Sequence, residues 1–140
     1  MENIPKIVCT NIWKLFGPNE KSILSNLDKS LSRNEVQEKT GHVVAVKDVN
    51  FSVNKGETFV VMGLSGSGKS TLVRCISRLI EPTNGKVKID NIDVTQMNKR
   101  ELMDLRRNRM SMVFQHFGLF PHKKVIDNIG YGLEIRGAKL

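Results

Sequence analysis

The residues most able to do chemistry in this chain form one glycine-rich run at positions 63–71. The run reads Gly-Leu-Ser-Gly-Ser-Gly-Lys-Ser-Thr and fits the phosphate-loop pattern G-x-x-x-x-G-K-[ST] at every position. Glycines allow a backbone to curl until several amide N–H groups point at one anion. The Lys69 ammonium can reach the β- and γ-phosphates of a nucleotide, and the Ser70 hydroxyl is a ligand that Mg²⁺ accepts. The run therefore predicts a binding site for a nucleoside triphosphate and its magnesium ion.

The segments on either side of this loop agree with that prediction. Residues 59–62 are apolar, as in a buried strand, and residues 71–76 have a helix-like pattern. A helix that begins at the loop presents its positive N-terminal end to the same phosphates. The loop does not define the reaction, because kinases, GTPases and transport ATPases all use it. The nucleotide-binding residues expected in the loop are Gly63, Ser65, Gly66, Ser67, Gly68, Lys69, Ser70 and Thr71.

Length and composition are those of a soluble globular domain. The chain has 140 residues, of which 39% are hydrophobic and 26% are charged, and no apolar run approaches the roughly 18 residues of a membrane span. Its net charge of +8 is compatible with a nucleic acid, an anionic membrane surface or a phosphate ligand. Cys9 and Cys75 have no metal-ligand spacing, so we interpret them as reduced core residues of a cytosolic protein.

Hydrophobic periodicity and turn residues predict a mixed α/β sheet. Ser32 and Glu35 have the spacing of a capping box, and Gly41 can close the helix that this box begins. Asp90-Asn91 separates two short apolar runs and predicts a hairpin. The strands expected are 6–12, 44–53, 58–62, 87–89, 92–94 and 110–114, and the helices expected are 22–31, 32–41, 71–80, one after Asn98 and one near 125–133.

Two separated stretches together resemble a known family. The phosphate loop is followed, at an interval typical of ATP-binding cassette (ABC) ATPases, by residues 112–117, Met-Val-Phe-Gln-His-Phe. More narrowly, the chain resembles the ATPase subunit of bacterial glycine betaine/proline importers. The implied fold is an α/β phosphate-loop NTPase core with an N-terminal antiparallel β subdomain and a helical insertion at about 19–41, incomplete at its C-terminus. The stretches that carry the narrower resemblance are 14–17, 39–41, 62–74, 78–83, 106–107, 120–122 and 127–128.

The resemblance implies roles for particular residues. Lys69 and the loop amides would hold the phosphates of ATP, and Ser70 would be a ligand of Mg²⁺. Gln115 matches the family's Q-loop glutamine, which senses the magnesium ion and the attacking water and couples the site to a membrane partner. Phe16 matches the aromatic residue that stacks on adenine in many cassettes, and a core phenylalanine is the alternative interpretation.

The chain also departs from the family pattern. Nothing from His116 to Leu140 supplies the signature sequence, the strand ending in Asp-Glu (Walker B), the switch histidine or the regulatory domains of this family. We therefore expect residues 1–140 to be the N-terminal part of a longer nucleotide-binding domain, to bind ATP without hydrolysing it, and to expose strand edges. His116 and His122 have no third ligand nearby, so surface contacts are expected of them rather than metal binding.

The implied setting is the cytoplasmic face of a bacterial plasma membrane. The expected partners are transmembrane permease subunits, a second ATPase subunit as a homodimer and, indirectly, a substrate-binding protein, with ATP and Mg²⁺ as cofactors. Two alternatives remain open. One is a soluble ABC-type ATPase that acts on nucleic acid or ribosomes. The basic net charge favours this alternative slightly, but our main interpretation expects no nucleic-acid partner. The other is a non-functional gene fragment.

Overall fold

The computed structural model describes residues 5–115 and 118–137. The chain divides into two compact units, Met1–Asn98 and Lys99–Leu140. The first unit contains β1 (Ile7–Phe16), α1 (Glu20–Asn26), α2 (Arg33–Thr40), β2 (Val43–Val53), α3 (Lys69–Ile76), β3 (Asn84–Ile89), β4 (Ile92–Asp93) and the 3₁₀ helix η1 (Val94–Gln96). The second unit contains α4 (Lys99–Asn108) and α5 (Val125–Glu134).

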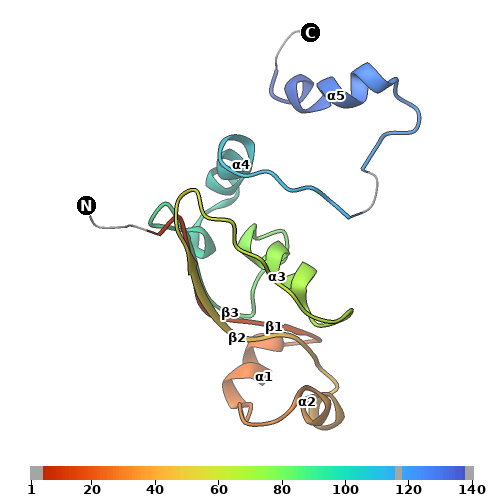
Figure 1. Cartoon of the computed structure of the whole chain (residues 1–140). Helices are drawn as coiled ribbons and strands as arrows, with labels where there is room; N and C mark the ends of the chain where they lie inside the picture. Colours follow the sequence, from red (N-terminus) through yellow and green to blue (C-terminus); the bar gives the residue numbers. More distant parts are fainter. Residues whose placement is uncertain (1–4, 116–117, 138–140) are drawn as a thin grey trace. The chain divides into compact units, whose positions relative to one another are not determined.

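A four-stranded antiparallel sheet in the order β2-β1-β3-β4 forms the frame of the first unit (Figure 1). The central strand β1 pairs on both sides, so that Ile7 lies opposite Val53 on β2 and opposite Ile89 on β3. Both edges of β1 are therefore paired, and its side chains Ile12 and Leu15 are fully buried. The predicted antiparallel β subdomain is present.

The turn between β3 and β4 follows the sequence prediction. Asp90 and Asn91 both have positive φ, 49° and 66°. Two successive left-handed residues form the type I′ turn whose twist matches that of paired strands, and Asn is among the residues that tolerate this backbone. The Nζ of Lys6 lies 2.7 Å from the Asp90 carboxylate and ties the turn to the start of β1.

The second helix of the insertion begins and ends as predicted. The Ser32 hydroxyl accepts a hydrogen bond from the amide of Glu35, the Glu35 carboxylate accepts one from the amide of Ser32, and Gly41 ends α2 at φ 71°. The first helix is shorter than the predicted 22–31, because α1 ends at Asn26 and Leu27 is extended. Beyond it, the Asp28 carboxylate accepts hydrogen bonds from the amide and hydroxyl of Ser30, a local turn that competes with helix.

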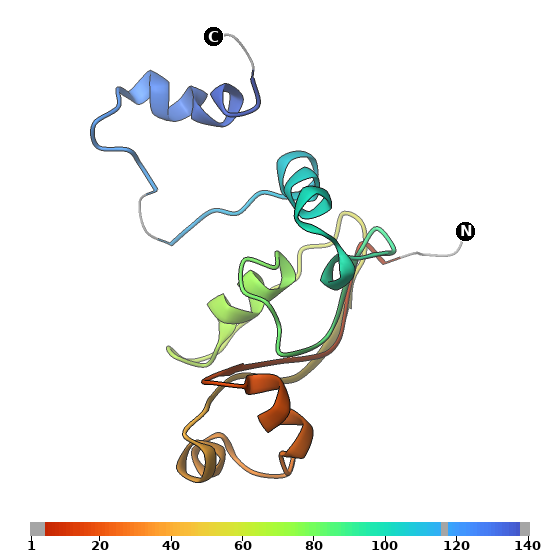
Figure 2. The same cartoon turned by 180° about the vertical axis from the view of Figure 1, so that it is seen from behind.

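The insertion is packed against the sheet rather than projecting from it. A buried cluster joins α1 and α2 to β1 and β2, and its members are Trp13, Leu15, Leu24, Val36 and Val44. The two views agree that α1 and α2 lie together on one side of the sheet and that α3 lies on the other (Figures 1 and 2). The ends of the insertion are also joined, because the His42 ring nitrogens lie 2.8 Å from the Thr40 carbonyl oxygen and 2.7 Å from that of Pro18.

Two apolar runs that the sequence predicts as strands, the first of them buried, are not strands in the structure. Residues 58–62 and 110–114 have no strand pairing in the part of the chain that the structure describes. Val60, Met62 and Val113 are 67%, 86% and 98% exposed. An apolar run forms a strand only when a neighbouring strand takes its backbone hydrogen bonds, and no described segment does so here. The strand prediction was therefore wrong for both runs, and the prediction of burial was wrong for 58–62.

Two element boundaries also differ from the prediction. The helix α3 ends at Ile76 rather than near residue 80, and Arg78 then has a positive φ of 52°. The Arg78 guanidinium donates to the carbonyl oxygens of Val94 and Met97, at 2.9 and 2.6 Å, so the segment after the helix is tied to η1 and the residue that follows it. The predicted turn at 82–85 is partly strand, because β3 already begins at Asn84.

The second unit contains the predicted basic helix α4 and the predicted last helix α5. Asn128 on α5 fixes the preceding loop, because its side-chain oxygen accepts from the amide of Phe120 at 2.7 Å and its side-chain nitrogen donates to the Phe120 carbonyl at 3.1 Å. The Phe120 ring also lies against Tyr131, with centroids 4.5 Å apart. None of the helices in the described ranges combines the length and hydropathy that a membrane span requires.

Both cysteines are free and buried, and burial raises the thiol pKa of Cys9 to about 12 and that of Cys75 to about 11, from 9.0. Because the folded pKa values lie above the unfolded value, the stability that neutral thiols contribute is complete below pH 9 and falls as the pH rises toward 12. We expect urea unfolding to show a loss of roughly 1 kcal/mol per thiol between pH 8 and pH 10. The control is the double variant Cys9→Ala/Cys75→Ala, which keeps all other titrations. An equal loss in the variant would contradict the prediction.

Candidate functional site

The phosphate loop is a tight, glycine-dependent turn at the start of α3. Gly66 and Gly68 have positive φ values of 77° and 97°, a backbone conformation that is costly for side chains with a Cβ. The amide of Ser67 donates to the carbonyl oxygen of Leu64 at 3.2 Å and closes the turn. These features give the curled backbone that the sequence predicts.

The loop lies directly against strand β2. A Cβ atom added to Gly68 would lie 2.0 Å from the carbonyl oxygen of Ala45, which is far inside van der Waals contact. The two residues are 23 positions apart in the sequence, so this close approach comes from the tertiary packing of the loop on the sheet. Gly68 therefore meets two requirements at once, a left-handed backbone and a space with no side chain.

Helix α3 begins at Lys69 with Gly68 as its N-cap, and the amide of Leu72 donates to the Gly68 carbonyl at 2.8 Å. No acidic residue lies in its first turn, so the partial positive charge at this end is not neutralised by the helix itself. Leu72 and Cys75 are buried and anchor the helix from one face. The helix end is thus fixed, and it favours an anion.

The Lys69 ammonium lies inside the loop. Its Nζ donates to the carbonyl oxygens of Gly63 and Leu64 at 2.8 and 2.7 Å, and to the Ser67 hydroxyl at 3.3 Å. A triphosphate would offer this cation charged oxygens in place of neutral carbonyls, and hydrogen bonds between ionised groups are stronger than those to neutral groups. This position suits an ammonium group that exchanges its carbonyl partners for a phosphate oxygen when a nucleotide binds.

The loop hydroxyls are accessible. Ser65 and Ser70 are exposed, and Thr71 is half-buried. The described ranges contain no group of three or more His, Cys, Asp or Glu side chains that could hold a metal ion. This does not conflict with the Mg²⁺ expected here, because Mg²⁺ at such sites takes most of its ligands from phosphates and water. Ser70 is the loop residue suited to be the protein ligand.

A residue that the sequence reasoning did not select, Arg33, reaches the same loop. Both terminal nitrogens of its guanidinium donate to the Ser67 carbonyl oxygen, each at 3.3 Å. Together with Lys47 and loop residues 67–69, Arg33 lines a cavity of about 230 Å³ between β2 and the loop. The only sequence signal was its position inside the capping box, between Ser32 and Glu35. The contact itself could not be predicted, because Arg33 and Ser67 are 34 positions apart.

Phe16 is the last residue of β1, and 42% of it is exposed. The Lys14 ammonium lies 5.1 Å from the centre of its ring, and Lys14 is itself paired with Glu20 at 2.7 Å. An exposed ring at a strand end could stack on a base, whereas a core phenylalanine would be covered. The adenine contact of Phe16 remains a prediction.

Gln115 lies in an exposed bend of the second unit. Its role next to the phosphates stays a prediction. His122, in the same unit, is exposed and lies edge-on to Phe120, with ring centroids 5.9 Å apart. His116 lies outside the described residues.

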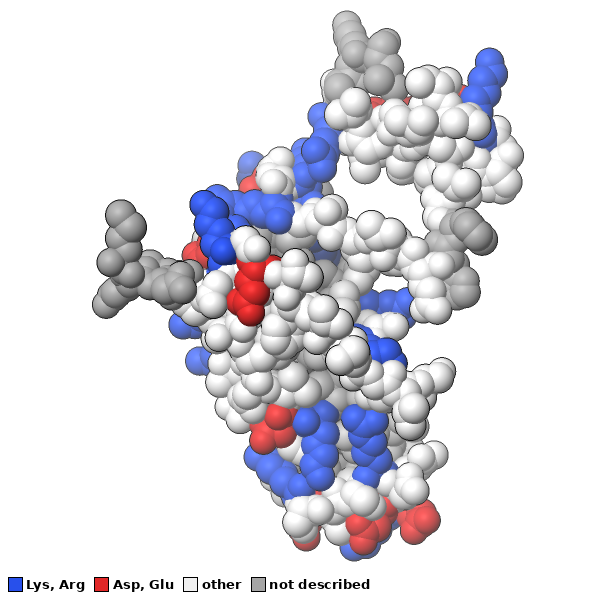
Figure 3. All heavy atoms as spheres, in the orientation of Figure 1, with Lys and Arg blue, Asp and Glu red and all other residues white. Residues whose placement is uncertain are grey.

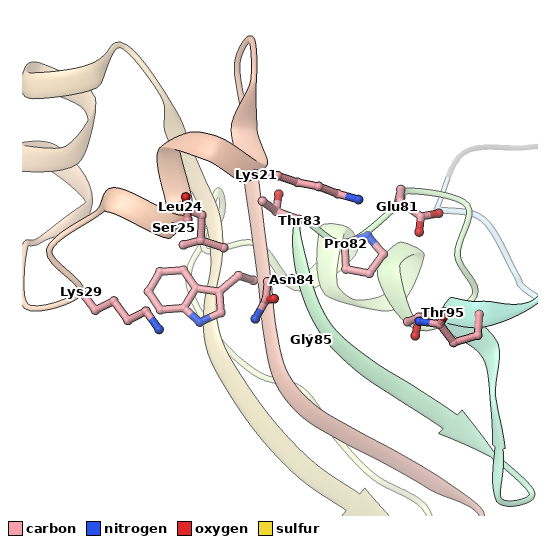
Figure 4. Close-up of a pocket in the computed structure, with 12 residues that line it drawn as sticks. Lys21, Leu24, Ser25, Lys29, Glu81, Pro82, Thr83, Asn84, Gly85 and Thr95 are labelled. Carbon is pink, nitrogen blue, oxygen red and sulfur yellow. The ribbon is translucent and has the colours of Figure 1, made fainter.

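A second cavity, of about 400 Å³, is separate from the phosphate loop (Figure 4). Lys21 and Ser25 from α1 face Thr83 and Asn84 at the start of β3, with Thr95 from η1. No residue of the loop lines it. The phosphate loop, and not this cavity, has the cation and the amide geometry that suit phosphate.

Within the first unit, the face drawn in Figure 3 shows Lys and Arg side chains with Asp and Glu side chains among them, and not one uninterrupted basic patch. A single long basic stripe would be the expected footprint of a nucleic-acid surface. The charge distribution on this face therefore adds no support to the nucleic-acid alternative.

Comparison with known proteins identifies the family of this chain. The sequence profile of the family described as "ABC transporter" matches residues 46–139. A trimethylamine N-oxide transport system ATP-binding protein from Pelagibacter ubique is 50% identical over 135 residues, covering 96% of this chain and 39% of that protein. A glycine betaine/proline betaine transport system ATP-binding protein from Salmonella typhimurium is 46% identical over 132 residues, covering 94% of this chain and 33% of that protein.

A solved structure shares the fold. It is a dimeric ATP-binding cassette in a post-hydrolysis state, bound to ADP and Pi, with a TM-score of 0.73 and 31% identity over 96% of this chain and 50% of that chain. The predicted fold class, a cassette-type α/β phosphate-loop fold with an antiparallel subdomain, is confirmed. This chain spans 39% and 33% of the lengths of the two relatives above.

The contact between Gly68 and Ala45 leads to a test of the loop. We expect Gly68→Ala to lower the free energy of unfolding by about 2–4 kcal/mol, because the added methyl group meets both a left-handed backbone and a carbonyl oxygen. The matched control is Gly66→Ala, which has a similar φ but nothing within 4 Å of the added Cβ, and which should lose about 1–2 kcal/mol. Urea unfolding measures both. Equal losses would show that the contact with β2 is unimportant.

Proposed function

The chain belongs to the ABC transporter family, and from that premise we propose that it forms the ATP-binding core of an importer subunit for methylated amine osmolytes. The observation that carries the proposal is the Lys69 ammonium inside a curled loop at the free positive end of α3. The substrate class is proposed from the relatives, whose names specify trimethylamine N-oxide and glycine betaine/proline betaine.

Nucleotide binding would use the loop in three ways. Its amides and the N-terminus of α3 would hold the phosphates, and Lys69 would leave the carbonyl oxygens of Gly63 and Leu64 to bind a phosphate oxygen. Ser70 would hold Mg²⁺, which neutralises charge on the phosphates. We further propose that Phe16 stacks on the adenine ring.

The transport cycle is proposed for a protein of the relatives' length, because this chain spans about a third of them. In that protein a second ATPase subunit and transmembrane permease subunits would be the partners, with a substrate-binding protein delivering the osmolyte. Gln115 would link the nucleotide to the permease. In this proposal the chain would lie at the cytoplasmic face of the membrane, and ATP hydrolysis would occur in the assembled protein.

The nucleotide site is tested by Lys69→Ala. Removing charge-assisted hydrogen bonds worth about 1.5–3 kcal/mol should weaken Mg-ATP binding about 10- to 150-fold, measured by calorimetry on the folded chain. Lys55→Ala removes the same charge from the exposed turn before the loop and should leave the affinity unchanged. An equal affinity in wild type and Lys69→Ala would mean that the loop is not the site.

The transport role is tested by a chimera. Residues 5–137 of this chain would replace the matching segment of the Salmonella typhimurium relative, which is 46% identical over 132 residues. We expect uptake of labelled glycine betaine at high osmolarity to be retained by the chimera and abolished in the same chimera carrying Lys69→Ala. A stable, membrane-associated chimera without uptake would contradict the proposal for this chain.

A further inference from the structure

We infer that Arg33, in the first turn of α2, is a positioning residue of the phosphate site, which makes the helical insertion part of that site. The inference rests on the proposed nucleotide binding and goes beyond it. The contact that carries it is the pair of hydrogen bonds from the Arg33 guanidinium to the Ser67 carbonyl oxygen, both 3.3 Å long. This contact joins residues 34 positions apart in the sequence.

Ser67 is the residue through which the loop is held. Its amide donates to the Leu64 carbonyl oxygen at 3.2 Å, and its hydroxyl accepts from Lys69 at 3.3 Å. Its carbonyl oxygen accepts from Arg33. The first two hydrogen bonds lie within the loop. The hydrogen bonds from Arg33 are the ones that tie Ser67 to another element, α2.

The contact with the Ser67 carbonyl also affects the Gly68 amide, because both belong to one peptide group. In a planar trans peptide, the C=O and the following N–H point in opposite directions. Holding the Ser67 carbonyl toward Arg33 therefore turns the Gly68 N–H away from Arg33. The Gly68 amide immediately precedes Lys69, where loop amides are needed to bind phosphate. Arg33 thus sets the direction of one phosphate donor without binding the phosphate itself.

The backbone on both sides of Arg33 is anchored. The capping box of Ser32 and Glu35 fixes the turn in which Arg33 lies, with the Glu35 carboxylate 2.7 Å from the amide of Ser32. The Lys47 ammonium on β2 donates to the Leu31 carbonyl at 2.8 Å, two residues before Arg33. Val36, three residues later, is buried in the cluster that joins the insertion to the sheet. The guanidinium is therefore carried by a docked element.

The test compares the Mg-ATP affinities of four forms of the chain by calorimetry, at a temperature where circular dichroism shows each to be folded. Arg33→Met keeps the aliphatic stem and removes the donors, and we expect about 3- to 10-fold weaker binding. Arg33→Lys restores one cationic donor and should recover more than half of the lost affinity on a logarithmic scale. Lys39→Met removes the same charge from the last turn of α2 and should bind as the wild type does.

Two outcomes would overturn the inference: Arg33→Met binding as tightly as Lys39→Met, or Arg33→Lys binding no better than Arg33→Met. Lys69→Ala, titrated alongside, separates this claim from the proposed function. Wild type and Lys69→Ala binding equally would overturn the nucleotide site itself. If Lys69→Ala weakens Mg-ATP binding and Arg33→Met does not, only the role of Arg33 is overturned.

Discussion

The close approach of Gly68 to the carbonyl oxygen of Ala45 is the constraint on which the site depends. It presses the end of the phosphate loop onto β2, so that the first residue of α3 has a defined place on the sheet. The buried face of α3 then keeps the helix there, so the C-terminal end of the loop has a fixed position. A side chain at position 68 would separate the loop from the strand that supports it.

The insertion gives the loop a second support. Its two helices are attached to β1 and β2 by a buried cluster, and the first turn of α2 reaches back to Ser67. The loop is thus held by β2 on one part of its backbone and by α2 on another. A short glycine-rich segment has little stability of its own, because glycine loses much conformational entropy when it is ordered. Contacts from two other elements offset that cost.

The sequence predicted local structure well where neighbouring residues decide it. The capping box of α2, the glycine that ends it and the left-handed pair at Asp90 and Asn91 were all predictable, since each depends on residues at most a few positions apart. The two apolar runs at 58–62 and 110–114 were predicted wrongly, because apolar composition indicates burial but cannot supply a strand partner. Their state depends on which other segment is present to accept their hydrogen bonds.

The sequence by itself determined the chemistry of the site: the glycines, the cation and the hydroxyls occur at fixed spacing, and a spacing of a few residues is enough to define a phosphate loop. Only the tertiary structure decided what holds that loop. The contacts of Gly68 with Ala45 and of Ser67 with Arg33 join residues 23 and 34 positions apart. Such contacts depend on how the sheet and the insertion pack, and packing is a property of the whole fold that no local pattern contains.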